Sequence, residues 1–166
     1  MPTLRVNGYD MAFAERGTGT PLLLVHGTLC DYRHWTGQME PFGAHYRTIA
    51  VSLRHCWPEK WDGEGDDFTV QQHTRDVASF IAALEAGPVH LLGHSRGGHI
   101  AFRAAENYPD LIRSLVLVEP GGCWRRISRQ VLCRLHRRSR WARSTQRRPN
   151  EFGAAKSTKI FSPQLT

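Results

Sequence analysis

Long apolar runs, paired cysteines and a leader segment are all missing from this sequence. No stretch approaches the roughly 18 uncharged apolar residues that a membrane-spanning helix needs. The four cysteines form no CxxC pair and no Cys/His spacing suited to zinc, and the N-terminus lacks a basic region followed by an apolar run. These absences predict a cytoplasmic protein with reduced thiols and no membrane association, and we expect neither a metal nor another cofactor.

Acidic residues are nearly absent from the C-terminal end of the chain. Residues 1–120 hold 10 Lys and Arg against 14 Asp and Glu, whereas residues 121–166 hold 12 against 1. The net charge of +7 therefore divides into −4 for the first part and +11 for the second. Because no helical or strand period is sustained after Gly121-Gly122, we predict a folded domain at residues 1–122 and a basic, irregular tail at residues 123–166.

Short apolar segments bounded by Gly, Pro or polar residues predict the strands of a buried parallel sheet. These segments are residues 22–26, 48–53, 89–92 and 114–118. Ahead of them, residues 4–16 alternate weakly around Asn7-Gly8, a dipeptide that favours a tight turn between two antiparallel strands. The chain is therefore expected to begin with a β-hairpin and to continue into a parallel sheet.

Helical periods occupy two of the intervals between the later strands. Residues 69–85 place apolar side chains three and four positions apart, and Thr69 with Gln72 predicts a capping box at the start of that helix. A second helix is predicted to begin beside Ser95 and to end near Asn107. Strands that alternate with helices predict an α/β fold, a doubly wound and mostly parallel sheet with flanking helices.

The segment Gly93-His94-Ser95-Arg96-Gly97 lies between a predicted strand and a predicted helix. A Gly-x-Ser-x-Gly pentapeptide in that context is typical of a nucleophile elbow, in which strained dihedrals project the serine hydroxyl away from the sheet. A neighbouring strand runs into His26-Gly27-Thr28, so its turn can face the same point. We interpret Ser95 as the nucleophile, and the backbone amides of Thr28 and Arg96 as the oxyanion hole.

Four segments carry a resemblance to a known superfamily. In their order and spacing, HGTLCDYRHW, SLRHCWPE, GHSRGGHIAF and RSLVLVEPGG resemble the α/β-hydrolase fold, in its serine esterase and haloperoxidase-like branch. The resemblance covers residues 1–122. It implies acyl transfer through a serine ester, with a small ester, lactone or related acyl compound as the substrate, and a Ser/acid/His triad in that chain order.

The remaining triad members depart from the superfamily pattern. Glu119 follows the predicted strand 114–118 and occupies a place where some members carry the acid. His136 is the only histidine after that strand, and it lies in an arginine cluster that we interpret as a tail. No catalytic histidine is therefore identified, and the chain is predicted to be a truncated hydrolase. A non-catalytic binding protein on the same fold is the alternative.

The basic tail and its surroundings leave several interpretations open. The tail is an arm that binds nucleic acid or another anionic polymer through residues 123–148, a continuation read out of frame, or a folded end of unfamiliar type. The missing later strands would leave an exposed sheet edge at residues 114–118, which predicts self-association. Near the strand ends, four side chains are expected at the site entrance: Arg54, His55, Trp57 and Trp61.

Overall fold

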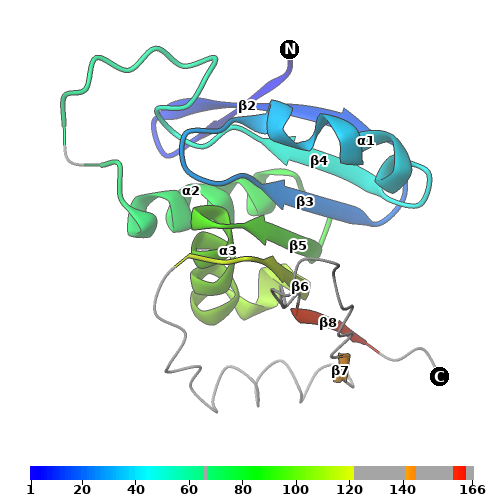
Figure 1. The fold of residues 1–166 in the computed structure, drawn as a ribbon. Helices are drawn as coiled ribbons and strands as arrows, with labels where there is room; N and C mark the ends of the chain where they lie inside the picture. Colours follow the sequence, from blue (N-terminus) through cyan, green and yellow to red (C-terminus); the bar gives the residue numbers. More distant parts are fainter. Residues whose placement is uncertain (66, 122–140, 145–158, 164–166) are drawn as a thin grey trace, which may run out of the picture.

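The computed structural model describes residues 1–65, 67–121, 141–144 and 159–163, the last two segments as backbone strands only (Figure 1). The strands are β1 (Thr3–Val6), β2 (Tyr9–Arg16), β3 (Pro21–Val25), β4 (Arg47–Val51), β5 (Val89–His94), β6 (Ile112–Val118), β7 (Trp141–Ser144) and β8 (Lys159–Pro163). The helices are η1 (Tyr32–Trp35), α1 (Thr36–Gly43), α2 (Val70–Ala83), α3 (Arg96–Asn107) and η2 (Pro109–Leu111), where η marks a 3₁₀ turn.

The strands form one sheet in the order β1-β2-β4-β3-β5-β6-β8-β7. Strands β4, β3, β5 and β6 are parallel, which confirms the four predicted segments and the α/β fold. Strands β1 and β2 form the predicted antiparallel hairpin, and β2 continues antiparallel to β4. The central strands therefore all end at the same edge, where a ligand site of an open α/β sheet is expected.

Helices cover both faces of this sheet, so its central strands are apolar on both sides (Figure 1). Successive residues of a strand point to opposite faces. On β3, Leu23 and Val25 therefore face α2 and α3, whereas Leu22 and Leu24 face Trp35 of η1 and the α1 side. This division explains why the strand residues form a continuous apolar run with no alternation.

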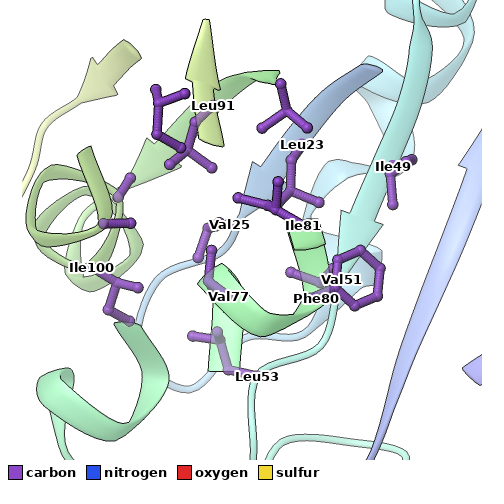
Figure 2. Packing of buried hydrophobic residues seen from close by; sticks show 14 of the residues in the cluster. Leu23, Val25, Ile49, Val51, Leu53, Val77, Phe80, Ile81, Leu91 and Ile100 are labelled. Atoms are coloured by element: carbon purple, nitrogen blue, oxygen red, sulfur yellow. The ribbon is translucent and has the colours of Figure 1, made fainter. Parts of the chain in front are cut away.

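The larger core lies between the sheet and the helix pair α2 and α3. Figure 2 shows Phe80 and Val77 of α2 turned toward Val51 and Val25 of the sheet, with Ile100 of α3 beside them. Phe80 is completely buried, and its ring meets that of Phe13 edge to face at 5.4 Å between centroids. The apolar period predicted for residues 69–85 is therefore the face of α2 that closes this core.

Three local features differ from the sequence expectation or add to it. Thr69 accepts a hydrogen bond from the Gln72 amide as predicted, but the Gln72 side chain donates to Asp76 and does not return to complete a capping box. The turn η1 and helix α1 were not predicted, because α1 carries Pro41 and buries none of its residues fully. Strand β8 pairs with residues 115–117 of β6, so that stretch is not a free edge.

A buried ion pair ties the N-terminal hairpin to α2. Arg54 donates to both carboxylate oxygens of Asp76, at 2.9 and 3.1 Å, and also to the carbonyl of Asn7 at 3.0 Å. The Asp76 side chain is 0% exposed and accepts further bonds from the side chains of Asn7 and Gln72. Because each charge is multiply hydrogen-bonded, the pair meets the condition under which burial of ions is tolerated.

We expect Phe80→Ala to lower the free energy of unfolding by about 3–5 kcal/mol, because it opens a cavity between α2 and the sheet. Denaturant titration of the full chain measures this loss. Leu29→Ala is the control, since the Leu29 side chain is 96% exposed. Its expected change is within about 0.5 kcal/mol. Equal losses for both variants would contradict the assignment of Phe80 to the core.

Candidate active site

Ser95 occupies the sharp turn between β5 and α3. Its backbone dihedrals are φ 50° and ψ −120°, a conformation that L-residues other than glycine rarely adopt. The Ser95 carbonyl begins helix α3 by accepting hydrogen bonds from the amides of Gly98 and His99, at 2.9 and 3.2 Å. A strained serine held between a strand and a helix is the geometry that the nucleophile-elbow interpretation requires.

Glycines permit the crowding around this turn. A Cβ atom on Gly93 would lie 2.3 Å from the Gly97 carbonyl oxygen, and one on Gly97 would lie 2.3 Å from the carbonyl oxygen of His26. Both contacts are with backbone atoms, which cannot rotate away. The elbow and the end of β3 therefore approach each other at a distance that only glycine allows.

The turn after β3 lies directly against Ser95. A Cβ atom on Gly27 would be 3.2 Å from the Cβ of Ser95, so the backbone of this turn passes beside the serine side chain. Thr28 follows as an exposed residue, and Arg96 is the first residue of α3, where backbone amides have no partner inside the helix. The structure thus brings the turn that contains Thr28 next to the Ser95–Arg96 junction.

His26 fixes the shape of that turn. Its Nε2 accepts a hydrogen bond from the Leu53 amide at 3.0 Å, and its Nδ1 lies 2.8 Å from the Gly27 carbonyl oxygen. Because an amide can only donate and a carbonyl can only accept, the ring is neutral with its proton on Nδ1. Burial lowers the pKa of His26 to about 4, which keeps it in this form. His26 is a structural link between β3 and β4 and not a catalytic base.

Residues at the end of β6 form hydrogen bonds with the elbow on the side opposite β3. Ser95 donates its amide to the Val118 carbonyl at 3.0 Å and accepts at its own carbonyl from the Gly121 amide at 2.8 Å. Glu119 lies between these two contacts, exposed and with φ 41°. The structure places Glu119 near the elbow backbone, and no hydrogen bond joins its carboxylate to a histidine within residues 67–121 or the preceding described segment.

The histidines close to the elbow do not supply a hydrogen-bonded base in the part of the chain that the structure describes. His94 stacks on His34, with 4.9 Å between ring centroids, and its Nδ1 is buried without a partner. Burial and the neighbouring His94 lower the pKa of His34. Among the described residues none is hydrogen-bonded to the Ser95 hydroxyl. His136 lies outside the described residues, and so does the predicted anionic-polymer arm at residues 123–148 apart from the backbone of β7 (Trp141–Ser144).

The four side chains expected at the entrance are not equivalent. Arg54 is buried against Asp76, so its placement at the entrance was wrong. Trp57 and Trp61 are exposed, and His55 stacks on Trp61 while its Nε2 lies 2.5 Å from an oxygen of Asp67. The pairing of Arg54 depends on Asp76, which lies 22 residues further along the chain, and nothing in the sequence near Arg54 indicates it.

The contacts between the elbow and the residues after β6 were also not predicted from the sequence. Gly121 was interpreted only as the domain boundary, although its amide holds the Ser95 carbonyl. Gly98 was overlooked as well, and a Cβ there would lie 2.6 Å from the Cβ of Pro120. A glycine directly after the pentapeptide and a Pro-Gly pair after the next strand are the signals that indicate this contact.

Neither a metal cluster nor a membrane-spanning helix is found within the described ranges. No group of three or more His, Cys, Asp or Glu side chains there is placed to hold a metal ion. No helix in the same part of the chain is long and apolar enough to cross a bilayer.

Comparisons with known proteins agree with this geometry. Residues 22–164 match the model of the Alpha/beta hydrolase family. An uncharacterized protein of Mycobacterium tuberculosis (strain ATCC 25618 / H37Rv) is 31% identical over 124 residues, which are 73% of this chain and 36% of that protein. A soluble epoxide hydrolase of Corynebacterium sp. (strain C12) is 28% identical over 114 residues, which are 69% of this chain and 39% of that protein.

A solved structure is also similar to this chain. That of a thermophilic esterase from Thermogutta terrifontis superposes with a TM-score of 0.62 at 32% identity, covering 71% of this chain and 43% of the esterase. The chain spans little more than a third of the length of the curated relatives named above, 36% and 39%. The similarity therefore concerns the part of those proteins that corresponds to the sheet and the elbow.

We expect Gly97→Ala to destabilise the fold by several kcal/mol, on the order of other forced overpacking, because the new methyl group overlaps the His26 carbonyl. Thermal unfolding followed by circular dichroism measures the effect. Gly37→Ala is the matched control, since a Cβ there has no neighbour within 4 Å and the residue lies in helix α1. An unchanged melting temperature for Gly97→Ala would contradict the close approach of the elbow and β3.

Stability should also fall as the pH is lowered from about 6.5 to about 4. Burial lowers the pKa of both His26 and His73 from 6.5 to about 4, so the unfolded chain binds protons first in this window. Each histidine accounts for up to about 3 kcal/mol. Denaturant titrations at several pH values measure the free energy of unfolding. As the pH falls, this free energy should decrease less steeply in His73→Leu than in the parent. His45→Gln, at an exposed position, should keep the pH dependence of the parent. Identical slopes for all three proteins would refute this account.

Proposed function

Because the chain belongs to the Alpha/beta hydrolase family, we propose that it is a serine-nucleophile hydrolase of small ester, lactone or related acyl substrates. The observation that carries the proposal is Ser95, strained at φ 50° with the backbone of Gly27 against its side chain. We propose that the Ser95 hydroxyl faces the backbone amides of Thr28 and Arg96. That arrangement supports attack on a carbonyl carbon.

The reaction follows from the chemistry of these groups. Ser95 Oγ bonds to the acyl carbon, its proton passes to a base, and the carbonyl oxygen becomes an oxyanion. The amides of Thr28 and Arg96 are proposed to stabilise that oxyanion, and one such donor is worth about 3–4 kcal/mol in the transition state. The base returns the proton to the leaving oxygen, so the alcohol departs and leaves a serine ester, which water then hydrolyses to the acid and free Ser95.

A serine nucleophile also favours acyl substrates over epoxides. Attack of Oγ on an epoxide carbon would form an ether, and water does not cleave an ether under conditions in which it cleaves a serine ester. The similarity to a soluble epoxide hydrolase therefore supports the fold of this chain more strongly than it supports that substrate. The chemistry of residue 95 points to esters and lactones.

The residue that accepts the Ser95 proton is not identified in the proposed site. Serine is a weak nucleophile without a positioned proton acceptor. Enzymes of this kind that lose triad members retain about 10³ to 10⁴-fold catalysis over water through binding and the oxyanion hole. We therefore propose slow hydrolysis by the chain alone, with Glu119 as the candidate acid. A binding protein that uses the same fold without chemistry is the competing function.

We expect a fluorophosphonate probe to label the full chain at Ser95. Phosphonylation requires a nucleophilic hydroxyl beside an oxyanion hole, so Ser95→Ala should abolish the label. Ser79→Ala, in which a serine of α2 is removed, should leave labelling unchanged. Mass spectrometry of the labelled peptide identifies the site, and circular dichroism verifies that each variant is folded. A folded wild-type chain that stays unlabelled would favour the binding function over the enzyme.

A further inference from the structure

Arg96 directly follows the proposed nucleophile, and its guanidinium lies in an unusual environment. The group rests over the ring of Phe68 at 4.6 Å from its centroid, and its Nη2 donates to the Phe68 carbonyl at 3.0 Å. Phe68 immediately precedes the cap of α2, so the guanidinium lies between the first residue of α3 and the start of α2. Both helices begin at the edge of the sheet that contains Ser95.

No carboxylate of the described residues pairs with this guanidinium. Asp31 is bound by Arg33 at 2.7 Å, and Asp67 is engaged by His55 and Arg54. Burial lowers the pKa of Arg96, and the opposing electrostatic influence comes from the Cys56 thiol, with no Asp or Glu of the described residues contributing. An arginine is still protonated at neutral pH under such a shift. The site therefore holds a partly desolvated cation that lacks a counter-charge from these segments.

The unused hydrogen-bonding capacity of Arg96 adds a second observation. The hydrogen bonds of the Arg96 side chain within the described residues, to the Phe68 carbonyl and to His73 Nδ1, both use Nη2. Its Nε is buried without a partner, and Nη1 has no partner among the residues described. His73 offers no negative charge, because burial keeps it neutral with a pKa of about 4. A guanidinium with free donors and no anion beside it is suited to bind an anionic ligand.

We propose that the Arg96 guanidinium binds a carboxylate of the substrate, so that the enzyme selects acyl compounds carrying a second, ionised carboxyl group. This inference rests on the proposed hydrolase function and names its substrate class. The arginine side chain begins one residue from Ser95, which suits a carboxylate a few bonds from the scissile carbonyl. Monoesters of short dicarboxylic acids have that form.

A purely structural role for Arg96 makes a different prediction. If the side chain only holds the Phe68 carbonyl, its loss weakens charged and neutral ligands alike through movement of the start of α2. If it binds the ligand, its loss removes the preference for the charged ligand. The ratio of the two affinities therefore distinguishes these roles, whereas either affinity alone does not.

Isothermal titration of the full chain in a Ser95→Ala background measures that ratio without turnover. Monomethyl succinate is the anionic ligand, and methyl succinamate is its neutral counterpart of nearly equal size. We expect the anion to bind about 10-fold or more tightly, in line with a charge-assisted hydrogen bond. Arg96→Met should bring the ratio close to one, and Arg96→Lys should restore part of it, since the charge is kept without the planar fork.

Arg103→Met is the matched control, because Arg103 is also on α3 but is exposed and paired with Glu106. It should leave the preference for the anion unchanged. Absence of a preference in the parent, or an equal preference in Arg96→Met, overturns the proposal. If the anion is preferred while Ser95 takes no fluorophosphonate, the carboxylate site stands and the hydrolase does not. If Ser95 is labelled without a preference, the reverse holds.

Discussion

The close approach of three backbone segments at Ser95 is the constraint on which the rest of the site depends. Gly93 lets the end of β5 pack against the first turn of α3, Gly97 lets the elbow touch the end of β3, and Gly27 lets the turn after β3 run beside the serine side chain. Strain at a residue such as Ser95 costs on the order of 1–3 kcal/mol and persists only where the surroundings over-determine it. Here the surroundings are backbone contacts, so small local changes at these positions act directly on the nucleophile.

Buried polar groups secure the edge of the sheet around this contact. His26 joins the turn after β3 to Leu53, two residues after the end of β4, and Arg54 joins the same region to Asp76 of α2. Each of these groups is satisfied by hydrogen bonds, which offsets the cost of taking it out of water. Arg96 differs from them, because the described residues give its guanidinium a carbonyl and an aromatic face but no carboxylate. That contrast separates a structural cation from one available to a ligand.

The fold was largely predictable from the sequence because local patterns coincide with the tertiary arrangement. The four apolar segments became β3, β4, β5 and β6, and the period of residues 69–85 became the core face of α2. Helix α1 could not be predicted, since it has little apolar period and contains Pro41. The inward turn of Arg54 was missed for another reason, because its partner Asp76 is close only in space.

The Ser95 turn and its two glycines were predicted from one pentapeptide, whereas the contacts of Ser95 with the residues at the end of β6 were not. The hydrogen bond from the Ser95 amide to Val118 and the one from the Gly121 amide to Ser95 each join residues that are more than twenty positions apart. The proposed oxyanion donors were predicted from the strand-turn pattern, and the structure places their turn and the elbow side by side. The base could not be predicted, because no histidine follows a recognisable late strand.

The hydrogen bonds between Ser95 and the residues at the end of β6 also make the conformation of Ser95 depend on the order of folding. The residue after β5 is held on one side by β3 and on the other by the end of β6, so its strained conformation is supported only when β6 has docked. Contacts between residues distant in sequence form late, since loop closure must precede them. A chain with a partly assembled sheet would thus contain the complete pentapeptide with a relaxed serine. The strained conformation of Ser95 is therefore a property of the assembled sheet.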